Sequence, residues 1–174
     1  MRWYQVCLLL VLAGLARADI IRVPADQPTV QAAIDAAADG DEIIIAPGVY
    51  REALVIPGSI GSLTLRSETP GDDGVVGATV LSGDADGDGV GDRRILLVDS
   101  PAAGTAISLA GLTFADGAII YEDGSDAEPV GGAVRMEGGT LEVESCVFLR
   151  NRVDGLATSR GGAIAFANGT MTVT

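Results

Sequence analysis

The stretch ISLAGLTFADG, residues Ile107 to Gly117, is matched further along the chain by LEVESCVFLRN, residues Leu141 to Asn151. Apolar residues occupy the same positions in both copies, and the match needs no gap. Such internal repetition restricts the fold strongly, because every copy has the same apolar face to bury. The matched apolar pairs are Ile107 with Leu141, Leu109 with Val143, Leu112 with Cys146 and Phe114 with Phe148.

A second repeat adjoins the first. The stretch GGAVRMEGGT, residues 131–140, matches GGAIAFANGT, residues 161–170, and the final MTVT begins a third copy at Met171. The segment between the phenylalanine and the glycine pair differs in length between the copies, as expected of a loop. The matched apolar pairs here are Val134 with Ile164 and Met136 with Phe166.

Each copy alternates apolar and polar residues, slips at Ala110-Gly111 or Glu144-Ser145, and then alternates again. One copy cannot bury its apolar face alone, so successive copies should stack with strands about 4.8 Å apart. We therefore predict an all-β fold, a parallel β-helix or solenoid, with the glycine pairs at turns of positive φ. The alternative is a β-sandwich with two similar hairpins, in which equal spacing of both motif halves is not expected.

The N-terminal part has a helical half and a strand half. Val30, Ala33, Ile34 and Ala37 recur at helical spacing, and Asp39-Gly40 should end the helix. The apolar run at residues 43–45 then predicts a strand covered on both sides.

The first 18 residues, MRWYQVCLLLVLAGLARA, combine Arg2, an apolar run from Val6 to Leu15, and Ala16-Arg17-Ala18. This pattern is typical of a cleavable secretory signal, and the apolar run is too short to span a bilayer. We therefore predict a protein that is secreted or displayed at the cell surface. The predicted organisation is residues 1–18 as signal peptide, 19–40 as N-terminal strand and capping helix, and 41–174 as incomplete parallel β-helix coils.

The composition excludes several classes of function. The net charge of −13 argues against nucleic acid or anionic lipid as a partner. The chain has no histidine and no lysine, which excludes Ser-His and Cys-His triads, histidine-ligated zinc and Schiff-base chemistry. Signal cleavage removes Cys7 and leaves Cys146 alone, so no internal disulfide is expected.

An aspartate-rich loop is the candidate metal site. The stretch SGDADGDGVGD, residues 82–92, lies between predicted strands at 79–81 and 95–98 and contains Asp84, Asp86, Asp88 and Asp92. Carboxylates at alternating positions converge on one hard cation such as calcium, while the glycines permit the tight turn. The loop is not an EF-hand, because Ile95 stands where the bidentate acid is required. The alternative interpretation is a solvated Asp/Gly turn without an ion.

No catalytic set converges in the sequence. Glu142 and Glu144 point outward, but Thr172 and Thr174 occupy the equivalent positions in the next copy, so no acidic cluster builds up. Arg93-Arg94 follows the aspartate loop and is the candidate base of a calcium-assisted lyase, although loop charges that screen the acids are the simpler interpretation.

Two stretches resemble known families. The segment IRVPADQPTVQAAIDAAADGDEIIIAPGVYRE, residues 21–52, resembles the N-terminal segment of the pectin-lyase-like superfamily, and the F-x-x-N … G-G-A-[IV] pattern at residues 148–151 and 161–164 resembles polymorphic outer membrane protein repeats. The earlier copy departs from the pattern, with Gly117 in place of asparagine. The resemblance implies a right-handed single-stranded parallel β-helix with a short N-terminal capping helix. It does not specify an activity.

Two functions remain as hypotheses. The first is an exported β-helix scaffold or adhesin-like protein that binds an extracellular polysaccharide or a cell-surface component. The second is a polysaccharide lyase or glycoside hydrolase of the pectin-lyase-like superfamily whose catalytic coils lie beyond this sequence. We expect a longer protein, because TMTVT stops inside a predicted strand whose edge would be left unpaired.

Overall fold

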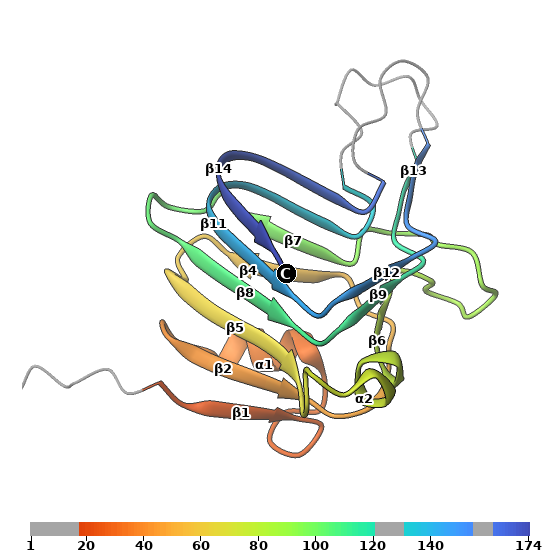
Figure 1. The fold of residues 1–174 in the computed structure, drawn as a ribbon, viewed down its shortest axis with the longest axis horizontal. Coiled ribbons are helices and arrows are strands. Elements are labelled where there is room, and N and C mark those ends of the chain that lie inside the picture. Colours follow the sequence, from red (N-terminus) through yellow and green to blue (C-terminus); the bar gives the residue numbers. More distant parts are fainter. Residues whose placement is uncertain (1–17, 121–130, 155–161) are drawn as a thin grey trace, which may run out of the picture.

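The computed structural model describes residues 18–120, 131–154 and 162–174. The predicted signal peptide, apart from its last residue, lies outside the described residues. The structure is mostly parallel β-sheet with two short helices in its described part (Figure 1). The elements are β1 (Ile20–Val23), α1 (Val30–Ala36), β2 (Asp41–Ile45), β3 (Gly48–Tyr50), β4 (Leu54–Pro57), β5 (Ser62–Ser67), α2 (Asp73–Ala78), β6 (Thr79–Ser82), β7 (Leu96–Asp99), β8 (Ala106–Ala110), β9 (Thr113–Ala115), β10 (Ala118–Ile120), β11 (Val134–Glu144), β12 (Val147–Leu149), β13 (Arg152–Asp154) and β14 (Ile164–Val173).

The described strands form three sheets in which every pair is parallel. The largest has the order β1-β2-β5-β8-β11-β7-β4, and β14 also pairs with β11. A second sheet has the order β12-β9-β6-β3, and the third consists of β10 and β13. Strands β1 and β14 lie at opposite ends of the structure (Figure 1).

The strand register confirms the matched residues of the repeats. Leu141 on β11 pairs with Ile107 on β8, and Val134 on β11 pairs with Ile164 on β14. Equivalent residues of successive copies are therefore neighbours on adjacent strands. The remaining matched pairs found in register are Leu109 with Val143, Phe114 with Phe148, and Met136 with Phe166.

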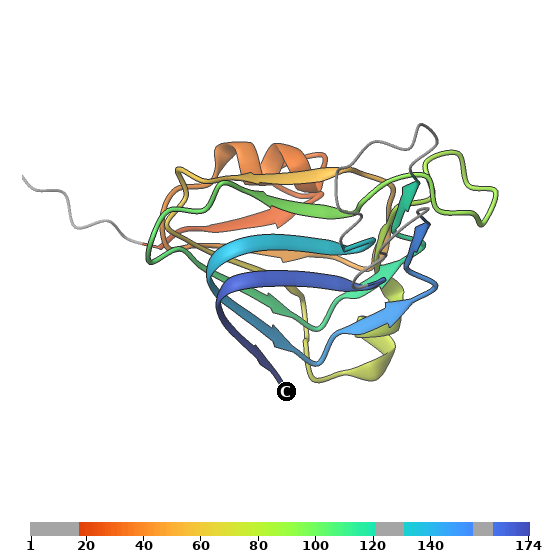
Figure 2. The same ribbon diagram turned by 90° about the horizontal axis from the view of Figure 1, so that it is seen from above.

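The predicted right-handed single-stranded parallel β-helix is wrong as a description of this structure, because the main sheet curls into a half-barrel and no solenoid is shown (Figures 1 and 2). The reason lies in β11, which runs without interruption through Gly138 and Gly139. Its first residues pair with β7 and its last with β8. Strands that a β-helix would hold in separate sheets therefore belong to one curled sheet.

Glycines allow β11 to bend without losing its partner. Gly138 and Gly139 have φ of 114° and 72°, values that side-chain-bearing residues rarely adopt. Gly139 nevertheless pairs with Gly169 of β14, so the ladder continues through the bend. In a sequence, two adjacent glycines usually indicate a turn that ends a strand. Here Gly138 and Gly139 lie within β11 and curve it.

The predicted N-terminal helix is confirmed as α1. Thr29 caps it by accepting a hydrogen bond from the Ala32 N–H, and its buried face carries Val30 and Ile34. The helix contacts β1, β2 and β4 near one end of the curled sheet (Figure 1). The Glu52 carboxylate accepts the backbone N–H groups of Val30 and Gln31, at 3.0 and 2.9 Å. A charge placed against free helix N–H groups stabilises this docking.

The core consists of inward aliphatic side chains and one aromatic pair. Ile43, Leu65 and Leu109 lie on adjacent strands and are fully buried. Phe114 is also fully buried, and its ring stacks on that of Phe148 with centroids 5.1 Å apart and an interplanar angle of 7°.

The bends predicted from the slips in alternation are confirmed by backbone geometry. Gly111 and Ser145 both have positive φ, 62° and 50°, at equivalent positions of the two copies. Positive φ was predicted for both glycine pairs, and only part of this prediction is confirmed. Gly131 has φ of 66°, Gly132 and Gly162 do not have positive φ, and Gly161 lies outside the described residues.

Asn151 joins two neighbouring copies through its side chain. Its Oδ1 accepts a hydrogen bond from the Gly117 N–H at 2.7 Å, and its Nδ2 donates to the Phe114 carbonyl at 2.9 Å. A side chain on Gly117 would place Cβ 2.8 Å from this Oδ1 and 2.4 Å from the Gly132 carbonyl oxygen. Glycine is therefore required at position 117 first by the close approach of the Gly132 carbonyl, and the Asn151 amide adds to the crowding.

We expect Asn151→Ala to lower the free energy of unfolding by about 1–3 kcal/mol, because it leaves two backbone groups without their partner. Asn151→Asp should cost less, since the acid still accepts from Gly117 but cannot donate to Phe114 while ionised. Urea unfolding of the three proteins measures the series. Equal stability of all three would contradict a bridging role.

Candidate metal site

The aspartate loop joins β6 to β7 and projects from the end of the β12-β9-β6-β3 sheet (Figure 1). Its base closes on Gly83, whose carbonyl accepts the N–H groups of Asp92 and Arg93 at 3.0 and 3.3 Å. The Gly83 N–H donates to Ala115 of β9 at 3.0 Å. A Cβ on Gly83 would lie 2.4 Å from the Arg93 carbonyl oxygen, so only glycine fits this position. The loop therefore starts from a fixed backbone.

Asp84 organises the inside of the loop. Only 4% of the residue is exposed. Its Oδ1 accepts from the N–H groups of Gly87 and Asp88 at 2.7 and 3.2 Å, and its Oδ2 accepts from Gly89 at 3.0 Å. Positive φ values of 85° at Gly87 and 87° at Gly89 turn these donors inward.

Asp86 and Asp88 complete a group that could hold a metal ion. One carboxylate oxygen from each of Asp84, Asp86 and Asp88 lies within 4.8 Å of the others. Asp86 Oδ1 accepts the Asp88 N–H at 3.1 Å, and Asp88 Oδ1 accepts the Val90 N–H at 2.7 Å. Each carboxylate has further lone pairs, so these bonds orient the oxygens without using all their acceptor capacity.

Asp92, the fourth predicted ligand, lies at the base of the loop. Its Oδ2 accepts the Ala85 N–H at 2.8 Å. It does not belong to the group of three carboxylates whose oxygens converge. A role for Asp92 as a ligand stays a prediction.

The pKa of Asp84 lies below its ordinary value. Burial of the carboxylate raises its pKa. This effect is outweighed by the hydrogen bonds from the N–H groups of Gly89, Gly87 and Asp88 and by the positive charge of Arg51, which lower the pKa. Asp84 is therefore a carboxylate at neutral pH and is available to a cation.

Arg51 belongs to the site although the sequence did not indicate it. A Cβ on Gly87 would lie 3.6 Å from the Nε and Nη2 atoms of Arg51, so the guanidinium lies beside the loop. Arg51 directly follows β3, which pairs with β6 in front of the loop. Arg51 could not be placed beside the loop from the sequence, because that requires knowing that β3 pairs with β6. Residues 48–50 and 79–82 share no repeat motif that would predict this pairing.

A groove of about 360 Å³ runs from the loop over the outer face of the β12-β9-β6-β3 sheet. The groove is lined by apolar side chains, two arginines, one aspartate of the loop and the aspartate that directly follows β9. Its lining includes Val49, Val80, Ala115, Leu149, Arg51, Arg150, Asp84 and Asp116.

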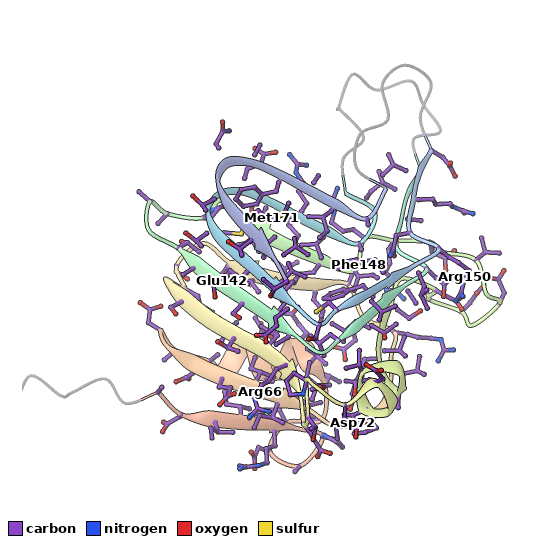
Figure 3. All side chains as sticks on the ribbon, in the orientation of Figure 1. Arg66, Asp72, Glu142, Phe148, Arg150 and Met171 are labelled. Atoms are coloured by element: carbon purple, nitrogen blue, oxygen red, sulfur yellow. The ribbon has the colours of Figure 1, made fainter. Side chains whose placement is uncertain are left out.

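The far side of the groove is fixed by an ion pair. Arg150 donates to both oxygens of Asp116, with Nε–Oδ1 at 2.6 Å and Nη2–Oδ2 at 2.8 Å. Hydrogen bonding to Asp116 and its negative charge raise the pKa of Arg150. Asp116 is 7% exposed, and both residues have positive φ, at equivalent positions of the two copies. Figure 3 shows Arg150 on the loop side of the molecule and Glu142 on the opposite side.

The other candidate residues do not gather at the groove. Arg94 Nε donates to the Gly131 carbonyl at 3.0 Å, and Arg93 and Arg94 line a separate hollow of about 190 Å³ beside β4. Glu142 and Glu144 are exposed on β11. Cys146 packs against the core as expected, and burial raises the pKa of its thiol.

Comparison with known proteins identifies no relative, since no protein-family model, curated protein or solved structure matches the chain. Within the described residues, no helix has the length and apolar character needed to cross a membrane.

The loop should lose stability in acid. Because the folded pKa of Asp84 is depressed, the unfolded chain binds more protons, so this contribution is present above the unfolded pKa of about 3.9 and is lost as pH falls through the lower folded value. Asp84→Asn should remove this part of the pH dependence. Hydrogen exchange of the Gly87 and Gly89 amides between about pH 5 and pH 2 measures it. An unchanged pH profile in the variant would contradict the assignment.

Proposed function

We propose that the protein is an exported extracellular or cell-surface scaffold, adhesin-like in function, that binds a glycan in the groove beside its aspartate loop. Calcium held by Asp84, Asp86 and Asp88 stiffens the wall of that groove. The proposal rests on one observation, the convergence of three carboxylates next to a groove that also contains Arg51. Export is inferred from the pattern of residues 1–18.

Calcium suits the chemistry of the loop. Its donors are carboxylate oxygens on a flexible glycine-rich backbone, and calcium accepts several oxygen ligands in irregular geometry. Two of the three acids are exposed, so a bound ion would keep several waters. Such partial coordination is consistent with dissociation constants of about 10⁻⁴–10⁻³ M, typical of extracellular modules.

A polysaccharide suits the groove better than nucleic acid does. The groove combines apolar side chains on β3, β6 and β12 with the guanidinium groups of Arg51 and Arg150. Sugar rings offer apolar faces, and an acidic sugar adds a carboxylate that arginine and calcium both bind. The net charge of −13 repels nucleic acid.

The second candidate function is a polysaccharide lyase or glycoside hydrolase. The juxtaposition of Arg51 and the aspartate loop favours it, because a lyase requires a base next to a cation that neutralises the substrate carboxylate. Membership of the pectin-lyase-like superfamily, proposed from residues 21–52, belongs to this hypothesis. The scaffold is preferred because Glu142 and Glu144 lie apart from the groove, and because Arg150 and Asp116 of its lining are already paired with each other.

Calcium should stabilise the folded protein. At free calcium ten times above the dissociation constant, the free energy of unfolding should rise by about 1.4 kcal/mol. Asp86→Asn with Asp88→Asn should abolish this rise. The matched control, Glu142→Gln with Glu144→Gln, removes the same charge from an exposed face and should retain it. Thermal unfolding with and without calcium measures the effect, and equal stabilisation of both double variants would remove the loop as the site.

Binding and turnover distinguish the two functions. We expect the protein to bind immobilised acidic polysaccharide in calcium without shortening the chains. Arg51→Gln should weaken binding about tenfold, whereas Arg22→Gln, on an exposed part of β1, should leave it unchanged. Release of oligosaccharides that is lost in Arg51→Gln would favour the lyase. Absence of both binding and turnover would contradict both functions.

A further inference from the structure

A nearly buried carboxylate lies where the chain enters the main sheet. Asp41 is the first residue of β2 and is only 5% exposed. Its Oδ1 accepts the Asp19 backbone N–H at 2.8 Å, and its Oδ2 accepts the Ala38 N–H at 2.8 Å. Asp19 directly precedes β1, which lies beside β2 (Figure 1). The carboxylate therefore joins the segment ahead of β1 to the turn ahead of β2.

No described side chain supplies a positive charge to Asp41. The two strands that flank β2 carry one arginine each, and both arginines pair with other acids. Arg22 of β1 lies 4.0 Å from Asp26, and Arg66 of β5 pairs with Glu42. The ion pairs of the other described arginines do not include Asp41 either. A carboxylate so little exposed is costly unless a cation compensates for its lost hydration, and two neutral N–H groups do so only in part.

Signal cleavage would create a cation at one of these two donors. The pattern of residues 1–18 predicts cleavage of the bond between Ala18 and Asp19, and both residues are exposed ahead of β1. A signal peptidase hydrolyses this bond with one water. The water oxygen enters the new Ala18 carboxylate, and both water hydrogens are gained by the Asp19 nitrogen, which becomes an ammonium group.

We propose that the α-amino group released by this cleavage forms an ion pair with Asp41 and fastens β1 to β2. The nitrogen is the same atom that donates to Asp41 at 2.8 Å, so the pair forms without rearrangement. The Asp19 carbonyl accepts the Glu42 N–H at 2.9 Å, which holds the new terminus in place. A hydrogen bond between two charged groups is stronger than one from a neutral amide, so processing stabilises the fold. The proposal rests on the export proposed above, but not on calcium or a glycan.

The first experiment locates the new terminus. The full chain is expressed in an exporting host, and mass spectrometry determines the first residue of the exported product. We expect this residue to be Asp19. An uncleaved chain would overturn the proposal together with the proposed export, whereas a product that begins at another residue would overturn this proposal alone.

The second experiment removes the charge of the terminus and keeps its hydrogen bond. Because the chain contains no lysine, the exported product has a single amino group, and an acetylating reagent modifies it selectively. Acetylation leaves one N–H donor, as in the uncleaved peptide bond. Urea unfolding should show that acetylation lowers the ratio of folded to unfolded protein about three- to tenfold.

Two variants assign this effect to one carboxylate. Asp41→Asn should abolish the difference between acetylated and free protein. The matched control, Asp39→Asn, removes the same charge from a carboxylate that accepts the Gly61 N–H, and it should retain the difference. Equal stability of the acetylated and free unsubstituted proteins, or a difference that persists in Asp41→Asn, would overturn the ion pair even where cleavage occurs before Asp19.

The rate of acetylation gives a measurement that needs no variant. An ammonium group paired with a carboxylate gives up its proton less readily, and only the deprotonated amine reacts. Near neutral pH, the folded product should therefore react at least about threefold more slowly than the same product unfolded in urea. Equal rates in the two states would contradict the proposal.

Discussion

In-register parallel stacking of apolar side chains is the constraint on which the rest of the structure depends. One column runs through Ile43, Leu65, Leu109, Val143 and Val173, on five strands that are adjacent in the sheet. Its first four members are buried and the last is exposed. Because each strand buries its apolar side chains only against equivalent residues of its neighbours, a slip of one residue would expose them. The columns thus determine the position of every loop attached to the strands.

Close backbone contact at the corners links these columns to the candidate site. A Cβ on Gly83, Gly117 or Gly132 would lie 2.5 Å or less from a neighbouring carbonyl oxygen. At these three positions the backbone segments are therefore too close together for any residue except glycine. Gly83 begins the aspartate loop, and Gly117 receives the Asn151 amide. The groove, the Asp116–Arg150 ion pair and the loop therefore share one rigid corner. Substitutions there should disturb binding and folding together.

The sequence predicted the pairing of residues better than the shape of the fold. Equal spacing in two repeats was enough to place Leu141 beside Ile107 and Phe148 beside Phe114, and helical periodicity was enough for α1. The solenoid prediction failed at Gly138-Gly139, which curves β11 and does not end it. Two adjacent glycines look the same in the sequence whether they end a strand or curve it. The curl depends on the φ values and on which strands β11 contacts along its length, which no periodicity encodes.

The same distinction holds for the site. Alternating aspartates identified Asp84, Asp86 and Asp88, since local spacing alone brings their oxygens together. Arg51 and the pairing of Arg150 with Asp116 were missed, because they come from segments far apart in the chain. Their proximity follows from the β3-β6-β9-β12 pairing, and only the last of these strand contacts was visible as a repeat.

Parallel stacking in this register is tested most directly by nuclear Overhauser contacts between strand backbones in isotope-labelled protein. We expect the parallel pattern, with Leu141 of β11 close to Ile107 of β8 on one side and to Met171 of β14 on the other. Close contacts between opposing Hα atoms, typical of antiparallel pairs, or a register shifted by one residue would contradict the structure.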